Sequence, residues 1–335
     1  MTTKCIRGAA AVCLTLAIIN LGSAKDGIVF EGQKGAGQGK HIVFLSGDEE
    51  YRSEEGLPML AKLLATRHGF KCTVLFAINP KDGTIDPNNQ TNLPGLAALD
   101  SADLCVLLLR FRELPDADMK HFVDYLNRGQ PIIALRTSTH AFAYSRNRQS
   151  PYAKFDWQNR QWPGGFGQQV LGETWVNHHG DHGKQSTRGI LSEEFKSHPI
   201  LRGVTDIWGP TDVYGVVHLP TKAQVLVRGQ VLRGMRPNDP PVEGPKNQPM
   251  MPLVWLNQYM GESGQPSRIV ATTMGAATDL ESPGLRRLLV NACYWAVRLA
   301  DKIPDAADVD YVGDYKPTGF GFGKFKPGVK PADWE

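Results

Sequence analysis

Short apolar runs alternate with amphipathic segments along most of the chain. The apolar runs are rich in β-branched and aliphatic side chains, which predicts buried strands. They lie at residues 41–46, 71–76, 103–109, 131–135, 252–256 and 268–273. Apolar residues recur at helical spacing at residues 53–67, 115–128 and 283–299, which predicts helices. Strands that are apolar on both faces and alternate with helices indicate an α/β fold, with helices on both sides of a parallel sheet.

The order of these elements predicts a single domain over residues 41–300. Right-handed crossovers between the strands lead us to expect a doubly wound, mostly parallel sheet of the flavodoxin-like type. Residues 25–40 are rich in glycine and lack periodicity, so we expect a flexible linker there. Residues 234–252 contain six prolines, which predicts a surface insertion. Residues 301–335 are rich in proline and glycine, and we expect an extended tail that lies on the domain.

The first 24 residues have the pattern of an export signal. Lys4 and Arg7 precede a nearly apolar stretch from Gly8 to Leu21, and small residues at a cleavage site follow at 22–24. An uncleaved anchor is the alternative, but the apolar stretch is short for a bilayer span. We therefore expect an exported protein, periplasmic or extracellular, with no membrane span after cleavage.

Composition is that of a globular protein, with 335 residues of which 41% are hydrophobic and 21% charged. The net charge of +3, without a long basic run, argues against a nucleic-acid partner. Signal cleavage removes Cys5 and Cys13. The remaining Cys72, Cys105 and Cys293 lie in apolar segments, which is typical of buried thiols. A single disulfide between Cys72 and Cys105 is the alternative that export would allow.

Polar residues follow the predicted strands at their carboxyl ends, where ligands bind in open parallel sheets. The turns in question are residues 47–52, 110–113, 136–140 and 274–279. Each could instead be a solvated turn or a helix cap, since carboxylates also suit the N-terminal end of a helix. The turn at 136–140, RTSTH, is the strongest candidate, because a strand-to-helix turn there would expose one of its polar groups as a nucleophile elbow does.

Three of the nine histidines fall in the segment TWVNHHGDHG. Neutral imidazoles bind zinc well, but the spacing matches no fixed zinc signature. If the segment is extended, His178 and His179 point to opposite sides. A pair such as His179 and His182 could converge, with Asp181 or His140 as a third ligand. A zinc site and a metal-free loop that binds substrate hydroxyls therefore both stay open.

Several segments, in chain order, resemble the ThuA-like family, which is named for trehalose utilisation and shares the class I glutamine amidotransferase-like fold. They are IVFLSGDEEYRSEE, PIIALRTSTHAF, VLGETWVNHH, HPILRGV, TDVYGV, RIVATTMGAATD and RRLLVNACYWA. The similarity covers about His41 to Arg298. The full-length pattern resembles exported members common in planctomycete-type bacteria.

The resemblance implies a carbohydrate ligand of the trehalose or keto-sugar type. In amidotransferases the elbow holds a nucleophilic cysteine, whereas the corresponding neighbourhood here is Arg136 to His140, so we do not expect glutamine hydrolysis. The family's late Gly-His pair is Gly275-Ala276 in this chain, so one histidine expected near the site is missing.

Three functions from different classes follow as hypotheses. The first is an enzyme that acts on a small carbohydrate by acid–base chemistry, with His140 as the lead group. The second is a non-catalytic carbohydrate-binding or scaffold protein. The third is a zinc-dependent hydrolase in which metal-bound water is the nucleophile. The candidate catalytic residues are His140, Asp48, Asp212 and Thr137; the candidate substrate-binding residues are Tyr51, Arg52, Arg110, Arg136, Ser138, Trp175 and Tyr214; the candidate zinc ligands are His178, His179 and His182.

Overall fold

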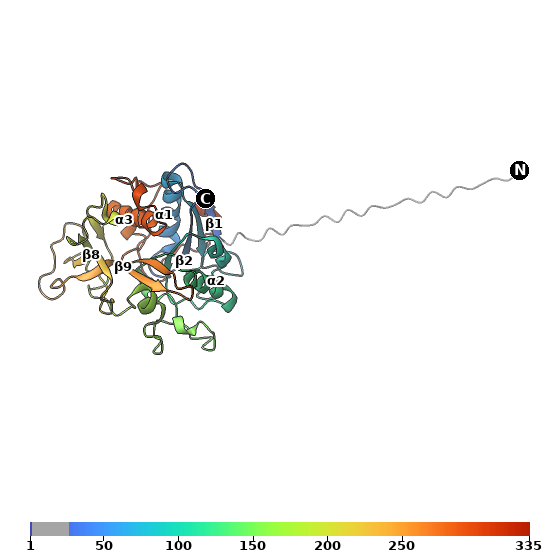
Figure 1. The fold of residues 1–335 in the computed structure, drawn as a ribbon, viewed down its shortest axis with the longest axis horizontal. Helices are drawn as coiled ribbons and strands as arrows, with labels where there is room; N and C mark the ends of the chain where they lie inside the picture. The colour runs from blue at the N-terminus through green and yellow to red at the C-terminus, as the bar shows by residue number, and fades with distance from the viewer. Residues whose placement is uncertain (2–26) are drawn as a thin grey trace.

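The computed structural model describes Met1 and residues 27–335, and in this part of the chain ten strands form one sheet (Figure 1). The sheet order is β1-β3-β2-β4-β5-β10-β9-β8-β6-β7. The strands are β1 (Gly27–Phe30), β2 (His41–Gly47), β3 (Lys71–Phe76), β4 (Leu104–Leu109), β5 (Ile132–Leu135), β6 (Thr187–Leu191), β7 (Ile207–Gly209), β8 (Gln224–Val231), β9 (Met251–Met260) and β10 (Pro266–Thr272).

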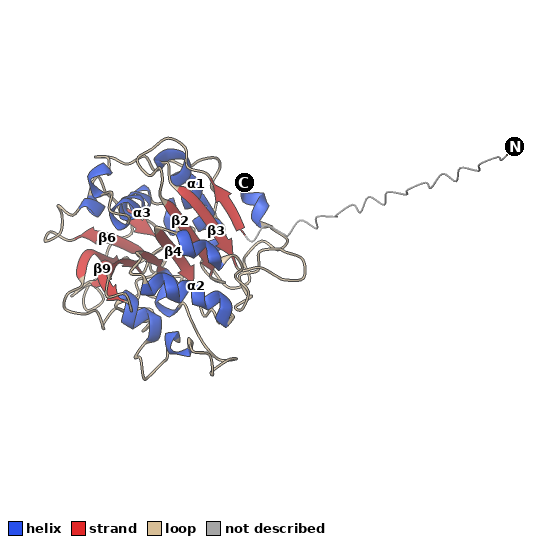
Figure 2. Cartoon of the chain, turned by 45° about the vertical axis from the view of Figure 1, so that its right-hand side comes forward, coloured by secondary structure: helices blue, strands red, loops and turns tan. Residues whose placement is uncertain are grey.

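Helices cover both faces of the sheet, as the alternation of elements predicts. The α-helices are α1 (Ser53–His68), α2 (Asp116–Asn127) and α3 (Pro283–Ala296). Apolar residues of α1 and α3 pack on one face and those of α2 pack on the other. Figure 2 shows α1 and α3 on one side of the sheet and α2 on the other. The short helical turns are η1 (Leu96–Ser101), η2 (Arg136–His140), η3 (Ala153–Phe155), η4 (Gly167–Leu171), η5 (Pro199–Leu201), η6 (Asp279–Glu281), η7 (Ala300–Lys302) and η8 (Pro331–Trp334).

The sheet is mixed, so the expectation of a mostly parallel sheet is wrong. Strands β3, β2, β4, β5 and β10 run parallel, whereas β9, β8, β6 and β7 extend the β10 side in antiparallel order. Of these, β8, β6 and β7 were not predicted from the sequence, because antiparallel strands need only one buried face. In β8, for example, buried and accessible positions are interspersed, and no continuous apolar run marks the strand.

The segment expected to be a flexible linker, residues 25–40, contains β1. This strand pairs antiparallel with β3, and the Ile28 side chain is buried. Two of the glycines that suggested a linker are closely packed instead. A Cβ atom on Gly32 would lie 2.1 Å from the carbonyl oxygen of Gly69, and one on Gly35 would lie 2.3 Å from that of His68.

The three described cysteines are free and buried. Cys72 packs on the face of the sheet that α1 and α3 cover, whereas Cys105 packs on the α2 face. A disulfide between them is therefore excluded by the sheet itself. The export signal expected over residues 1–24, with Cys5 and Cys13, lies outside the described residues apart from Met1. Within the described residues, no helix is long and apolar enough to cross a membrane.

The C-terminal residues lie across the domain and return to its first strand. The Arg286 side chain in α3 donates a hydrogen bond to the carbonyl of Val309, and the Tyr315 hydroxyl donates one to the carbonyl of Ala277. The chain ends beside β1 (Figure 1). This route carries residues 315–322 past the carboxyl ends of the parallel strands.

Candidate functional site

Polar turns from separate strands meet at the carboxyl-end edge of the parallel part of the sheet. Thr137, after β5, donates a hydrogen bond to Oδ2 of Asp48, after β2. The ring of Phe111, after β4, lies 5.1 Å from the ring of His140 in η2. The edge that the strand order marks as a ligand site therefore does gather the polar groups of several turns.

Asp212 lies at the centre of this site. Its Oδ2 accepts a hydrogen bond from Nδ1 of His178 at 2.7 Å, and its Oδ1 accepts one from Nδ1 of His182 at 3.0 Å. Oδ1 also accepts from Nη2 of Arg136 at 2.9 Å. The Asp212 side chain is fully buried, whereas the side chains of His178 and His182 are 37% and 35% exposed. A buried carboxylate thus orients two imidazoles that remain accessible to a ligand.

Neighbouring groups keep the Asp212 carboxylate ionised. Burial by itself raises the pKa of Asp212, but the Arg136 guanidinium and then the hydrogen bonds from His178 and His182 outweigh it and hold the pKa well below its usual range. In return, the hydrogen bond to Asp212 raises the pKa of His182 above its usual 6.5. His182 therefore keeps a proton to higher pH than a free histidine does.

Glu50 completes the surroundings of His182. Its Oε1 lies 3.4 Å from Nε2 of His182, on the side of the ring away from Asp212. Burial raises the pKa of Glu50, while Arg110 opposes the shift. The His182 ring thus has a carboxyl group near each nitrogen, which favours its protonated form.

Unlike His178 and His182, His140 is nearly inaccessible, with an exposed fraction of 3%. Its ring packs among those of Phe111, Trp157 and Trp175, with centroids 5.1, 6.2 and 5.8 Å away. The Trp175 ring also lies 5.9 Å from the ring of His178. Trp175 therefore contacts both His140 and His178.

Burial lowers the pKa of His140 well below its usual 6.5, and the nearby cations Arg110 and Arg136 lower it further. The ring is therefore neutral at neutral pH. His140 is thus enclosed as well as neutral, whereas His178 and His182 are exposed.

Arg136 occupies the strained position of the strand-to-helix turn. Its φ of 38° lies in the left-handed region, as does the nucleophile of an elbow, yet the side chain is a fully buried guanidinium. It donates to the backbone carbonyls of Asp212 and Thr273 and stacks on the rings of Tyr51 and Tyr214, 4.3 and 4.1 Å away. Arg136 therefore positions Asp212 and keeps it charged, and its side chain has no exposed surface.

Several other candidates hold the site together from inside. Asp48 is buried and accepts hydrogen bonds from the backbone of Glu50 and Tyr51 as well as from Thr137. The Ser138 hydroxyl donates to the carbonyl of Leu107 in β4. Arg52, which is fully buried, precedes α1 in a left-handed conformation and donates to the carbonyl of Glu49. These side chains join neighbouring turns to one another.

His179 does not belong to the site, so the expected pairing of His179 with His182 is wrong. Its Nε2 bonds to the backbone carbonyl of Lys246, away from Asp212. The imidazoles that converge are His178 and His182, whose ring centroids lie 4.6 Å apart, and their shared partner is Asp212. The prediction that adjacent histidines face opposite ways explains why only one of His178 and His179 points inward.

A C-terminal strap, defined here as residues 315–322, forms one wall of the site. Phe320 lies 5.6 Å from the ring of Tyr51 and 5.5 Å from that of His182. The strap is fixed by Thr318, which donates backbone and hydroxyl hydrogen bonds to Glu55 at 2.7 and 2.8 Å. The amide of Gly321 donates to the carbonyl of Glu50 at 2.8 Å. Sequence patterns miss this wall because its partners are far away in the chain; Glu55, for example, is 263 residues from Thr318.

Arg110 stands at the rim of the same wall. Its guanidinium lies between the rings of Phe111 and Phe322, 4.6 and 4.8 Å from their centroids. Its Nη1 pairs with Oε1 of Glu49 at 2.6 Å, and the other oxygen of Glu49 pairs with Arg112 at 3.0 Å. Of the three predicted arginines, Arg110 is the one with accessible surface, at 17% of its side chain.

Comparisons with known proteins find solved structures that are similar to this chain at low sequence identity. No family model and no curated protein matches the chain. A solved ThuA-like protein from Parabacteroides merdae is 14% identical, with a TM-score of 0.49, and the match covers 77% of this chain and 90% of that one. A solved ThuA-like protein from Bacteroides uniformis is 13% identical, with a TM-score of 0.47, and the match covers 79% of this chain and 94% of that one.

Proposed function

We propose that the protein is an acid–base enzyme that acts on a small carbohydrate of the keto-sugar type. The observation that carries the proposal is the pair of accessible imidazoles, His178 and His182, held on one buried, ionised carboxylate. Such a carboxylate fixes ring orientation and stabilises an imidazolium when it forms. A proton donor and a proton acceptor side by side are what proton transfer at a carbon next to a carbonyl requires.

We assign one imidazole as the general acid and the other as the general base. Their ring centroids are 4.6 Å apart, and two like charges at that distance repel, so the pair holds one proton more readily than two. The raised pKa of His182 and the nearby Glu50 make His182 the general acid. His178 bonds to Asp212 through Nδ1, which leaves Nε2 to accept a proton, so we assign it as the general base. Arg110 at the rim is placed to polarise a carbonyl oxygen.

The substrate class rests on the walls of the site and on the sequence resemblance. Aromatic rings of Trp157, Trp175, Phe320 and Phe322 surround the polar centre, and such rings suit the apolar faces of sugars. The similarity of the sequence to ThuA-like proteins implies a carbohydrate of the trehalose or keto-sugar type.

The test is a panel of trehalose and keto-glycosides, measured for both binding and turnover with the wild-type protein and with His182→Gln. The proposal expects turnover of a keto-glycoside by the wild type and its loss in the variant. Binding without turnover by either protein would instead support a non-catalytic carbohydrate-binding protein.

The rate is expected to depend on pH through His182. Because the folded-state pKa of His182 is raised, its acid form persists above pH 6.5 and is lost only as the pH rises through that higher value. Turnover should therefore fall on the alkaline side, with a midpoint above the 6.5 of an ordinary histidine. A rate profile from pH 5 to 10 checks this, and His182→Gln should lack the alkaline fall. A wild-type rate that declines already below pH 6.5 would contradict the assignment.

The strap should contribute to substrate binding. Phe320→Ala removes a ring that packs on Tyr51 and His182, so we expect KM to rise about tenfold with little change in kcat. Phe325→Ala, in the same tail, is the matched control and should leave both constants unchanged. Equal kinetics for Phe320→Ala and the wild type would show that the strap does not form part of the site.

A metal-dependent hydrolase is the second candidate, because ligand atoms of His178, His182 and Asp212 lie within 4.8 Å of one another. Two histidines and a carboxylate are a common zinc set with an open position for water. Against it, the Arg136 guanidinium already binds Asp212 at 2.9 Å, and its charge opposes a cation there. We therefore expect a chelator to leave turnover unchanged. Loss of turnover with EDTA, restored by zinc, would favour the metal candidate.

A further inference from the structure

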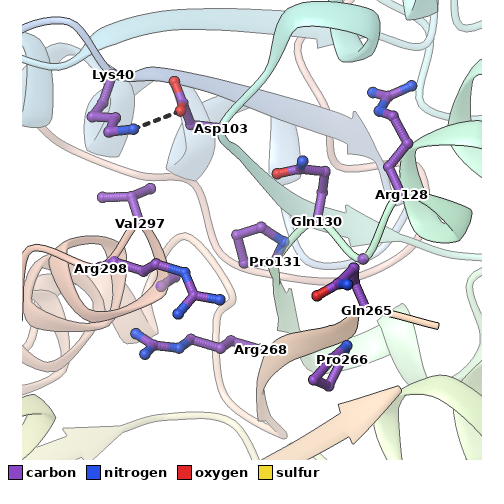
Figure 3. A pocket seen from close by; sticks show the side chains of 12 residues that line it. Lys40, Asp103, Arg128, Gln130, Pro131, Gln265, Pro266, Arg268, Val297 and Arg298 are labelled. Carbon is purple, nitrogen blue, oxygen red and sulfur yellow. Dashed lines mark hydrogen bonds and ion pairs between the residues drawn. The ribbon is translucent and has the colours of Figure 1, made fainter. Parts of the chain in front are cut away.

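A basic hollow lies at the opposite edge of the sheet, where the parallel strands begin (Figure 3). We define it by Lys40, Arg128, Arg268 and Arg298, which come from four separate segments of the chain. Lys40 precedes β2, Arg128 follows α2, Arg268 is in β10 and Arg298 follows α3. The cavity has a volume of about 260 Å³.

The positive charge of the hollow is largely uncompensated. Asp103 is the carboxylate among its lining residues, and Lys40 already pairs with it at 2.8 Å, as the dashed line in Figure 3 shows. Among the residues that the structure describes, no ion pair joins Arg128, Arg268 or Arg298 to a carboxylate. Three guanidinium charges are therefore left for another partner.

Two of these arginines donate hydrogen bonds to backbone carbonyls near helix ends. Arg268 donates to the carbonyl of Trp295 in the last turn of α3, and Arg128 donates to the carbonyl of Leu99 in η1. Cations bound to the free carbonyls of helix ends stabilise a fold. These two side chains thus have a structural role whether or not a ligand binds.

Arg298 has no such role. Its φ of 66° is left-handed, a conformation that glycine adopts most easily after a helix. Its guanidinium has no hydrogen-bond partner within the described part of the chain. Burial lowers the pKa of Arg268 and the neighbouring charge of Arg298 lowers it further, so the two side chains repel. Arg298 is exposed and lines the hollow, so its guanidinium is accessible to a ligand there.

We propose that the basic hollow binds a small phosphate-bearing molecule. Planar guanidinium groups bind phosphate oxygens in pairs, and Arg298 and Arg268 flank the hollow for such a contact. The side chains of Gln130 and Gln265 line the same hollow and offer neutral amide donors. The volume of about 260 Å³ lies below the range of drug-sized ligand pockets, so the ligand is small. The proposal is independent of the function proposed for the Asp212 site.

The test is calorimetric titration of the full protein with inorganic pyrophosphate at low ionic strength, with citrate as a second arm. We expect saturable binding of pyrophosphate that weakens as NaCl is added, since salt screens exposed charges. Citrate, a carboxylate of similar charge, should bind more weakly. Tighter binding of citrate than of pyrophosphate would overturn the phosphate assignment.

Arg298→Gly separates binding from folding. Glycine relieves the left-handed backbone, so the variant should melt at the same temperature as the wild type or higher, while pyrophosphate binds about tenfold more weakly. Arg236 is exposed and does not line the hollow, so Arg236→Ala is the control and should bind pyrophosphate as the wild type does. Unchanged binding by Arg298→Gly, or no saturable binding by the wild type, would overturn the proposal.

Discussion

Replacing Asp212 with asparagine is expected to remove most turnover and to lower the free energy of unfolding by about 3 kcal/mol, at the low end for breaking a buried ion pair. The carboxylate is fully buried and bonded to the equally buried Arg136. Asparagine keeps the shape but not the charge, so the guanidinium is left without its counterion. His178 and His182 lose the acceptor that orients them. Urea unfolding and turnover of the same preparations measure the two effects.

A matched control separates this effect from the loss of an ordinary charge. Asp308 pairs with Arg67 at 3.2 Å, but both side chains are well exposed. Asp308→Asn should therefore change the free energy of unfolding by less than about 0.5 kcal/mol, as exposed pairs do. If Asp212→Asn were as stable as the wild type, Asp212 would not be the charged centre of the site.

The second large effect is expected for His182→Gln, which should slow turnover by about 10²- to 10⁴-fold, the usual contribution of general acid–base catalysis. The side chain is 35% exposed, so the loss of stability should be small. His178→Gln should behave in the same way, because both imidazoles share Asp212.

His179→Gln is the control that the chain itself provides for this experiment. The residue adjoins His178 but bonds to the carbonyl of Lys246 and does not reach Asp212. Its turnover should equal that of the wild type. A loss of turnover in His179→Gln as large as that in His182→Gln would contradict the division of this segment into inward and outward histidines.

The parallel strands and the main helices could be predicted from the sequence because each carries its own local pattern. The apolar run at residues 71–76 became β3 with the same bounds, and the run at residues 41–46 became β2 with one more residue. Strands β6, β7 and β8 could not be predicted in this way. They are short or partly exposed antiparallel strands, and their pairing depends on partners far along the chain.

The candidate site could be predicted in position but not in detail. The rule that ligands bind at the carboxyl ends of parallel strands identified the turns that now meet around Asp212. Which histidine faces inward depends on the backbone of residues 177–182, and the role of Arg136 depends on its complete burial between two tyrosine rings. The Phe320 wall arises from the path of the C-terminal strap, for which the sequence carries no local signal.

We propose that His178 and His182, both bonded to Asp212, move a proton at a carbon beside a carbonyl. The most direct test is deuterium incorporation from D₂O into a keto-glycoside, followed by NMR, with the wild-type protein and with His182→Gln. We expect incorporation next to the carbonyl by the wild type and a rate at least about a hundredfold lower in the variant. Equal rates for the two proteins, or no incorporation by the wild type into any keto-glycoside of the panel, would contradict it.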